Sequence, residues 1–243
     1  MWPLCDARGG LIVMSVHPPK LVIFDCDGVL VDSEPLSLDV LVRVLRNAGV
    51  DMDAEEATER FLGKSLKTMS DILHEEYGLA VDDHFLEEMR LDLYQRFRRE
   101  LQPIAGISQA LDELDIARCV ASSSQMERIR LSLTITGLID KLEPHLFSAS
   151  MVANGKPAPD LFLHAAAQMH TAPENCIVIE DSPAGIEAAQ AAGMRVFAFA
   201  GASHAKSERH LATLRQLEPD VLFDDMRELI HFVRKEQRDG NAS

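Results

Sequence analysis

The sequence contains little of what marks a disulfide-rich or membrane-spanning protein. Only four of its 243 residues are cysteines, and their spacing includes no CxxC pair or zinc-type pattern. We therefore expect buried, reduced thiols in a cytoplasmic protein. No apolar run approaches the roughly 20 residues that span a bilayer, and the N-terminal segment lacks the apolar centre of a signal peptide.

Positive charge is also scarce. Lysine and arginine total 24 against 39 aspartates and glutamates, which gives a net charge of −15. An acidic chain without a basic cluster is a poor partner for nucleic acid or for an anionic membrane, so we expect neither. We expect a monomer, and any phosphate group that it handles would need a metal or a few placed lysines to neutralise it.

Short apolar runs alternate with helical patterns along most of the chain. The predicted strands cover residues 20–25, 118–121, the region around 146–147, 176–181, 195–199 and 221–223. Helical patterns cover residues 108–115, 125–134, 159–169 and 183–192. Pro159 suits the first position of its helix, and Gly193 suits the end of the last one. This alternation predicts an α/β fold: a Rossmann-like parallel sheet with helices on both faces.

A long helical segment interrupts the alternation after the first strand. Residues 36–101 carry apolar stripes at helical spacing and no strand-like run. We therefore predict a discontinuous α/β core over residues 20–35 and 102–237, with an inserted all-helical cap domain over residues 36–101. Residues 1–19 and 238–243 are predicted to be flexible tails.

Two acids directly follow the first predicted strand. Asp25 and Asp27 come after the apolar run at residues 21–24. A buried parallel strand would deliver them to the carboxyl edge of the sheet, which is where α/β proteins bind ligands. Unpaired acids are costly to bury. They suit a hard cation, or a nucleophile beside an acid or base.

Three further groups lie at the ends of later predicted strands. They are the serines at 122–124, Lys156 in a loop before a helix, and the pair Glu180 and Asp181. Because the carboxyl ends of parallel strands meet at one edge of a sheet, we expect these groups and the first two acids to share one crevice.

Such a set can perform phosphoryl transfer. Asp25, Asp181 and a backbone carbonyl offer oxygen ligands for Mg²⁺, and Glu180 is a further candidate that could hold the waters of the metal. Lys156 and the metal would neutralise a phosphoryl group, and the Ser122 hydroxyl with loop N–H groups could bind its other oxygens. The Asp25 carboxylate could then attack phosphorus.

Proton transfer falls to the second acid of the pair. Asp27 could protonate the leaving oxygen and later take a proton from the attacking water. Gly28 lets the chain turn sharply away from the strand.

Four segments resemble the ordered motifs of the haloacid dehalogenase superfamily. More narrowly, they are similar to its β-phosphoglucomutase-like branch of sugar-phosphate phosphatases and mutases: DCDGVLVDSEPL, VASSS, GKPAPDLF and VIEDSPAGIEAAQAAGM, within about residues 20–235. The resemblance implies that the helical insert is a cap that closes over the site. It also implies the following roles: Asp25 as nucleophile, Asp27 as acid/base, Ser122 and Lys156 on the phosphate, and Mg²⁺ held by Asp25, the Asp27 backbone and Asp181.

Weaker candidates for substrate contact surround this set. Gly28 and Ser123 lie beside the motif residues, and Lys64 and Lys67 lie between predicted helices of the insert. Other interpretations compete: the two lysines could be ordinary surface residues, and Ser122 could be a helix N-cap.

The residue at position 27 favours phosphate ester chemistry. Dehalogenases and phosphonate hydrolases of the superfamily lack an Asp there, because they do not protonate an alkoxide leaving group. The mutases that the chain resembles carry a His twelve residues after the nucleophile and a cap arginine, where this chain has Ser37 and Leu66. The sequence thus predicts a Mg²⁺-dependent phosphatase of small sugar or polyol phosphates, a phosphorylated metabolite being its partner.

Two alternatives stay open at this point. The first is a β-phosphoglucomutase-like sugar phosphate mutase. The second is a non-catalytic phospho-signalling or binding module, such as a receiver domain. A receiver domain has its acid pair before the phospho-acceptor Asp and carries no helical insert after the first strand, and this motif order argues against it.

Overall fold

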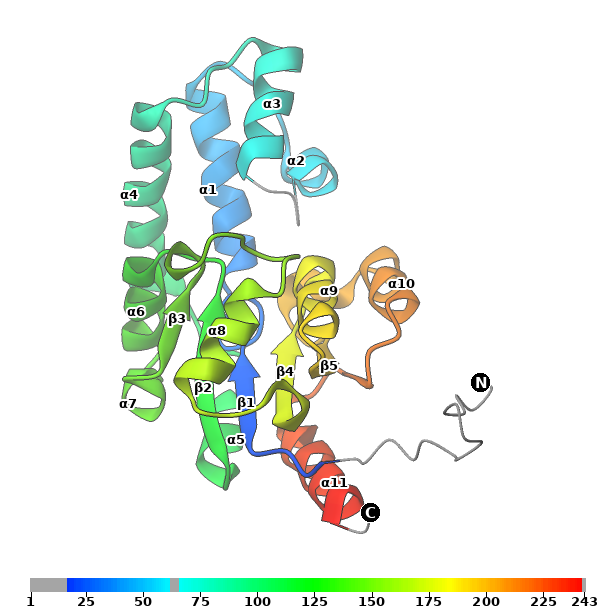
Figure 1. Cartoon of the computed structure of the whole chain (residues 1–243). Helices are drawn as coiled ribbons and strands as arrows, with labels where there is room; N and C mark the ends of the chain where they lie inside the picture. The colour runs from blue at the N-terminus through cyan, green and yellow to red at the C-terminus, as the bar shows by residue number, and fades with distance from the viewer. Residues whose placement is uncertain (1–16, 62–65, 242–243) are drawn as a thin grey trace.

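The computed structural model describes residues 17–61 and 66–241 of the chain (Figure 1). Its strands form one six-stranded sheet in the order β3-β2-β1-β4-β5-β6, and every pairing within it is parallel. The strands are β1 (Leu21–Phe24), β2 (Ala117–Ser122), β3 (Leu146–Ser148), β4 (Cys176–Glu180), β5 (Arg195–Phe199) and β6 (Val221–Phe223). The predicted α/β sheet is confirmed.

Strand β1 lies in the middle of the sheet. Ile23 pairs with Cys119 of β2 on one side and with Val178 of β4 on the other. All four β1 residues are fully buried, because alternate side chains of a strand enter the apolar layers on opposite faces of the sheet.

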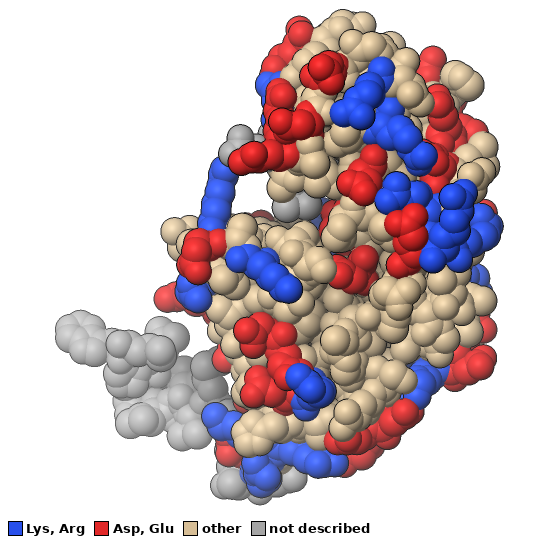
Figure 2. All heavy atoms as spheres, turned by 180° about the vertical axis from the view of Figure 1, so that it is seen from behind, with Lys and Arg blue, Asp and Glu red and all other residues tan. Residues whose placement is uncertain are grey.

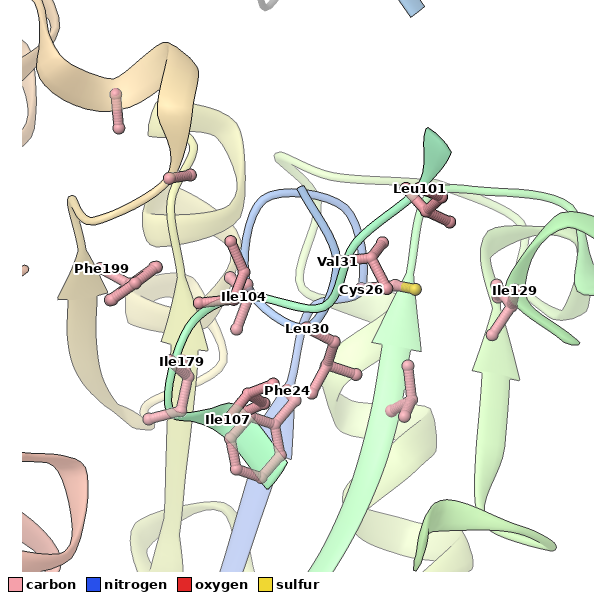
Figure 3. Packing of buried hydrophobic residues seen from close by; sticks show 14 of the residues in the cluster. Phe24, Cys26, Leu30, Val31, Leu101, Ile104, Ile107, Ile129, Ile179 and Phe199 are labelled. Carbon is pink, nitrogen blue, oxygen red and sulfur yellow. The ribbon is translucent and has the colours of Figure 1, made fainter. Parts of the chain in front are cut away.

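Helices cover both faces. Val22 and Phe24 of β1 pack with apolar residues of the helices on one face, which are α5 (Ile107–Glu113), α6 (Met126–Ile135), α7 (Ile139–Leu142) and α11 (Leu229–Asn241). Leu21 and Ile23 pack with those on the other, which are α8 (Asp160–Gln168), α9 (Pro183–Ala191) and α10 (Glu208–Gln216). Figure 3 shows the first layer, where Phe24, Ile179 and Ile107 lie close together.

The insert after β1 consists of helices joined by loops, with no strand among its described residues. It consists of α1 (Glu34–Asn47), α2 (Ala54–Phe61), α3 (Leu66–Tyr77) and α4 (Asp83–Glu100). Helix α4 begins where the Asp82 carboxylate accepts a hydrogen bond from Phe85 N, a standard N-cap. The four helices stand beyond the carboxyl ends of the strands, over the edge where the predicted site lies (Figure 1).

The insert leaves and re-enters the core at one place. Asp32 N donates to Gln102 O at 3.0 Å, and Ile104 N donates to Leu30 O at 3.0 Å. Val31 bridges to Pro103 between these two bonds. The two connecting segments therefore run side by side, close to the predicted boundaries of the insert.

Two expectations need correction. Residues 238–241 are not a flexible tail, because α11 continues to Asn241. Gly240 lies against the segment before β1: a Cβ at this position would be 2.5 Å from Pro18 N, so only glycine fits there. Pro159 occupies the N-cap of α8 rather than its first position. Residues 1–16 and 242–243 of the predicted tails lie outside the described residues.

Charged side chains of both signs lie on the surface. On the face shown in Figure 2, lysines and arginines lie among aspartates and glutamates over both the insert and the core. Within the two described ranges, no helix has the length and apolarity that crossing a bilayer requires.

Candidate active site

Three neighbouring strands end in residues predicted for the site. Asp25 directly follows β1, Ser122 ends β2, and Glu180 and Asp181 end β4 and begin the loop after it. Asp25 N continues the pairing with β4 by donating to Ile179 O at 3.0 Å. Since β1 lies between β2 and β4, the sheet itself brings these side chains to one edge.

Lys156 lies at the centre of the group. Its Nζ is 2.5 Å from Asp25 Oδ1, 2.6 Å from Glu180 Oε1 and 3.1 Å from Ala121 O. The Phe162 ring lies 4.8 Å from the same nitrogen. Burial alone would lower the pKa of Lys156, but the two carboxylates outweigh it and raise that pKa above its ordinary value. Lys156 is therefore a fixed positive charge beside Asp25.

The carboxylates outnumber this lysine. Burial raises the pKa of Asp25 well above its usual range; the charge of Lys156 opposes that rise, and the charges of Glu180 and Asp181 add to it. Burial also raises the pKa of Asp181. Closely spaced, buried oxygen donors with excess negative charge are the environment that a hard divalent cation fits.

The donor set suits Mg²⁺ in kind. Carboxylate and carbonyl oxygens are its preferred protein ligands, and it usually takes one or two carboxylates with waters. Within the described part of the chain, no three His, Cys, Asp or Glu side chains form a metal cluster. The oxygens that could hold the ion are those of the Asp25 and Asp181 carboxylates and the Asp27 carbonyl.

Asp27 is held by donors from three parts of the chain. Its Oδ1 accepts from Ser33 Oγ at 2.5 Å and from Arg128 Nη2 at 2.8 Å, and its Oδ2 accepts from Ser124 Oγ at 2.6 Å. Burial would raise the pKa of Asp27, but Arg128 and the two hydroxyls lower it below its usual value. In this arrangement Asp27 is an ionised carboxylate.

Arg128 is a site residue that the sequence reasoning missed. It belongs to α6, yet its guanidinium lies 5.3 Å from the Phe97 ring of α4 and its Nη2 lies 3.4 Å from Ser37 Oγ of α1. It therefore joins Asp27 to both helices at the base of the insert. No local sequence pattern indicates this role, because the contact with Asp27 depends on how α6 packs in the fold.

Glu180 uses both of its carboxylate oxygens within the protein. While Oε1 accepts from Lys156, Oε2 accepts from Asp181 N and Ser182 N, each at 3.0 Å, and from Ser182 Oγ at 2.9 Å. A Cβ at Gly185 would be 1.9 Å from this side chain, so the carboxylate fills the space beside the glycine. These contacts favour a role in positioning Lys156 and the loop over direct metal ligation.

Gly28 is required by its surroundings as well as by its backbone. Its φ is +83°, in the left-handed region, and a Cβ here would lie 1.9 Å from Asp181 Oδ2. His204 Nε2 contacts the same Oδ2 at 3.0 Å. His204 is a second residue that sequence reasoning did not place, because it reaches Asp181 from a loop after β5.

The remaining predicted site residues differ in burial and in whether the structure describes them. Ser122 Oγ accepts from Ser124 N at 3.1 Å and is almost fully buried, whereas Ser123 is exposed. Lys64 lies outside the described residues, and Lys67 lies on α3 with no described side chain.

A cavity of about 260 Å³ lies between the helices of the insert and Arg128 of the core. Glu34, Ser37 and Arg128 form its polar part, and most of its other lining is apolar, including Leu41 and Phe61. Burial and the charge of neighbouring Asp27 raise the pKa of Glu34. The cavity thus borders Arg128, which donates a hydrogen bond to Asp27.

Comparison with known proteins identifies the family. The model of the haloacid dehalogenase-like hydrolases matches residues 22–199. The chain belongs to this family. Membership, together with its phosphatase relatives, makes this haloacid dehalogenase-like chain a phosphoric monoester hydrolase.

Individual relatives cover most of the chain. It is 34% identical over 192 residues to 6-phosphogluconate phosphatase of Escherichia coli, covering 79% of this chain and 87% of that protein. It is 31% identical to hexitol phosphatase A of the same organism, covering 74% and 82%. Among solved structures, a conserved haloacid dehalogenase-like protein of Agrobacterium tumefaciens has a TM-score of 0.79 and 37% identity, covering 89% of this chain and 98% of that one.

Proposed function

We propose that the chain is a Mg²⁺-dependent phosphatase that hydrolyses small sugar or polyol phosphate monoesters through an aspartyl-phosphate on Asp25. The placement of Lys156 supports this most directly, because its ammonium is 2.5 Å from Asp25 Oδ1 at the converging strand ends. We further propose that it acts as a monomer in the cytoplasm, with a small phosphorylated metabolite as its partner.

The residues divide the work of the reaction. Asp25, the Asp27 carbonyl and Asp181 would hold Mg²⁺, which supplies positive charge against the phosphoryl oxygens. Lys156 adds a second positive charge there and fixes the Asp25 carboxylate. An Asp25 oxygen attacks phosphorus in line, the bond from phosphorus to the ester oxygen breaks, and Asp25 becomes an acyl phosphate.

Asp27 moves the protons in both halves of the reaction. When protonated, it gives its proton to the departing ester oxygen; as a carboxylate, it then takes one from the water that attacks the aspartyl-phosphate. This second attack releases inorganic phosphate and regenerates Asp25. Because Ser33, Ser124 and Arg128 hold Asp27 ionised in this structure, Asp27 has to leave these donors before it can protonate the leaving oxygen.

Size and similarity support the substrate class. A cavity of about 260 Å³ beside Arg128 suits the carbon skeleton of a small metabolite rather than a polymer. The relatives named above act on 6-phosphogluconate and hexitol phosphates according to their names. A mutase is disfavoured, since Ser37 stands where the mutases carry a His and its hydroxyl faces Arg128.

Asp25→Asn tests the proposal. Phosphate release is measured with and without Mg²⁺ on a panel of sugar, polyol and nucleotide monophosphates. Wild type is expected to release phosphate only with Mg²⁺, and Asp25→Asn to lose at least about 10³-fold in kcat, as expected when a nucleophile is removed. The matched control is Asp51→Asn, because the Asp51 side chain is 96% exposed in the insert.

Three outcomes would contradict the proposal. Undiminished release by Asp25→Asn would exclude the aspartyl-phosphate. Conversion of a hexose 1-phosphate to its 6-phosphate with little free phosphate would indicate a mutase. No release from any ester by wild type would indicate a binding or signalling protein.

A further inference from the structure

We propose that His204 is a positioning residue that orients the Asp181 carboxylate for the cation. His204 lies in a short 3₁₀ helix, Ser203–Lys206, that follows β5. None of the four motif segments contains it, since it lies 23 residues beyond Asp181 in the chain. The inference rests on the proposed function in one respect only, which is that the site binds Mg²⁺.

Two neighbours restrict the Asp181 carboxylate at one of its oxygens, Oδ2. His204 Nε2 is 3.0 Å from Oδ2, and both side chains are nearly buried, at 10% and 7% exposure. Gly28 lies beside the same oxygen, so close that a Cβ there would be 1.9 Å from Oδ2 and 3.0 Å from His204 Cε1. Both contacts involve Oδ2, so Oδ1 is the oxygen left to face a cation.

The imidazole is itself held in place. The His210 ring packs edge-on against it, with centroids 5.6 Å apart, and His210 Nε2 lies 2.9 Å from the Asp181 carbonyl. The neighbouring Ser203 is bonded to Asp32, with Ser203 N donating to Oδ1 at 3.2 Å and the hydroxyl donating to Oδ2. His204 Nδ1 is buried without a partner among the described residues, so packing and the Nε2 contact fix the ring.

This arrangement has a measurable consequence for metal binding. A carboxylate that keeps one oxygen in a hydrogen bond presents the other in a fixed direction, and removing such a partner typically weakens metal binding about 10- to 100-fold. The Asp181 carboxylate without His204 would have to be ordered by the cation itself. Loss of the imidazole should therefore weaken Mg²⁺ binding even in the absence of substrate.

The test is an isothermal calorimetric titration of the full-length protein with MgCl₂ in the absence of substrate. His204→Ala is expected to raise the Mg²⁺ dissociation constant about 10- to 100-fold. His204→Gln should recover most of the loss, because its side-chain N–H can reach a similar position. The control is His231→Ala on α11, where the side chain is exposed, and it should bind like wild type.

Several results would overturn the inference. They are an unchanged or lower dissociation constant for His204→Ala, an equal loss for His204→Ala and His204→Gln, or no Mg²⁺ binding by wild type. Thermal melting of each variant without Mg²⁺ identifies any unfolded protein, and the glutamine variant then carries the test. Failure of the proposed phosphatase would look different, since wild type would bind Mg²⁺ but release no phosphate from any ester.

Discussion

At the scale of single residues, the two acids after β1 have opposite surroundings. Asp25 meets Lys156 together with two other carboxylates, and burial raises its pKa. Asp27 meets a guanidinium and two hydroxyls, which lower its pKa. Two like groups two residues apart are thus tuned in opposite directions, as is common where one carboxylate attacks and another transfers protons.

The proton-transfer role of Asp27 can be tested through the leaving group. Asp27→Ala is expected to reduce kcat by about 10²- to 10⁴-fold on a sugar phosphate, which is the usual contribution of general acid–base catalysis. Under single-turnover conditions, formation of the aspartyl-phosphate from p-nitrophenyl phosphate should be affected far less, because p-nitrophenolate needs little protonation. Equal losses of this step on both substrates would contradict the acid role, and Asp51→Asn again serves as the control.

At the scale of elements, α4 anchors the insert to the core. Phe97 near the end of α4 is fully buried and lies under the Arg128 guanidinium of α6. The same helix exposes half of Leu91 to solvent. One helix therefore offers two apolar residues with very different expected contributions to stability.

We predict that Phe97→Ala lowers the free energy of unfolding by about 3–5 kcal/mol, from lost apolar burial and the cavity left behind. Leu91→Ala should change it by less than about 0.5 kcal/mol, as is usual at exposed sites. Urea denaturation followed by circular dichroism measures both. A loss for Phe97→Ala no greater than that for Leu91→Ala would show that α4 does not anchor the insert.

The sequence was most informative where the residues of a single element determine its structure. The apolar run before Asp25 predicts β1 because a strand buried on both faces needs no alternation. The positions of Arg128 and His204 were not predictable in this way. Each meets its acid only after a helix or loop from another part of the chain has packed against β1 or β4, and no local pattern encodes that packing.

Helix α11 is a second case in which the local sequence did not predict the structure. Its last turns are polar and suggested fraying, but Leu229 and Ile230 at its start are buried, and Gly240 fits against Pro18. The last turn of the helix thus packs against the segment at Pro18, which lies more than 200 positions earlier in the sequence. Tertiary contacts of this kind override local composition.

At the scale of the whole molecule, the two apolar layers enclose the thiols of the described residues. Cys26, Cys119 and Cys176 are each free and at most 1% exposed. Burial raises the pKa of all three thiols, that of Cys176 to about 12. Since the thiolate is the reactive form, both access and ionisation protect them.

We therefore expect these three cysteines to resist iodoacetamide at pH 8 in the native protein and to react fully in denaturant. Peptide mass spectrometry reports each site separately, so labelling of Cys5 does not interfere. Rapid native labelling at Cys119, in the central part of the sheet, would contradict the closed core. Labelling that rises together at all three sites with added urea would show that the core opens as one unit.

The junction at Val31 and Pro103 has a consequence for how such an enzyme changes over generations. A segment that leaves and re-enters the sheet at adjacent points lowers the stability of the core little more than a surface loop does, even when the segment is long. Substitutions within it can alter which molecules are admitted, while the groups at the strand ends keep their chemistry. Selection can thus act on recognition and on reaction as two separate traits, joined by a few backbone hydrogen bonds.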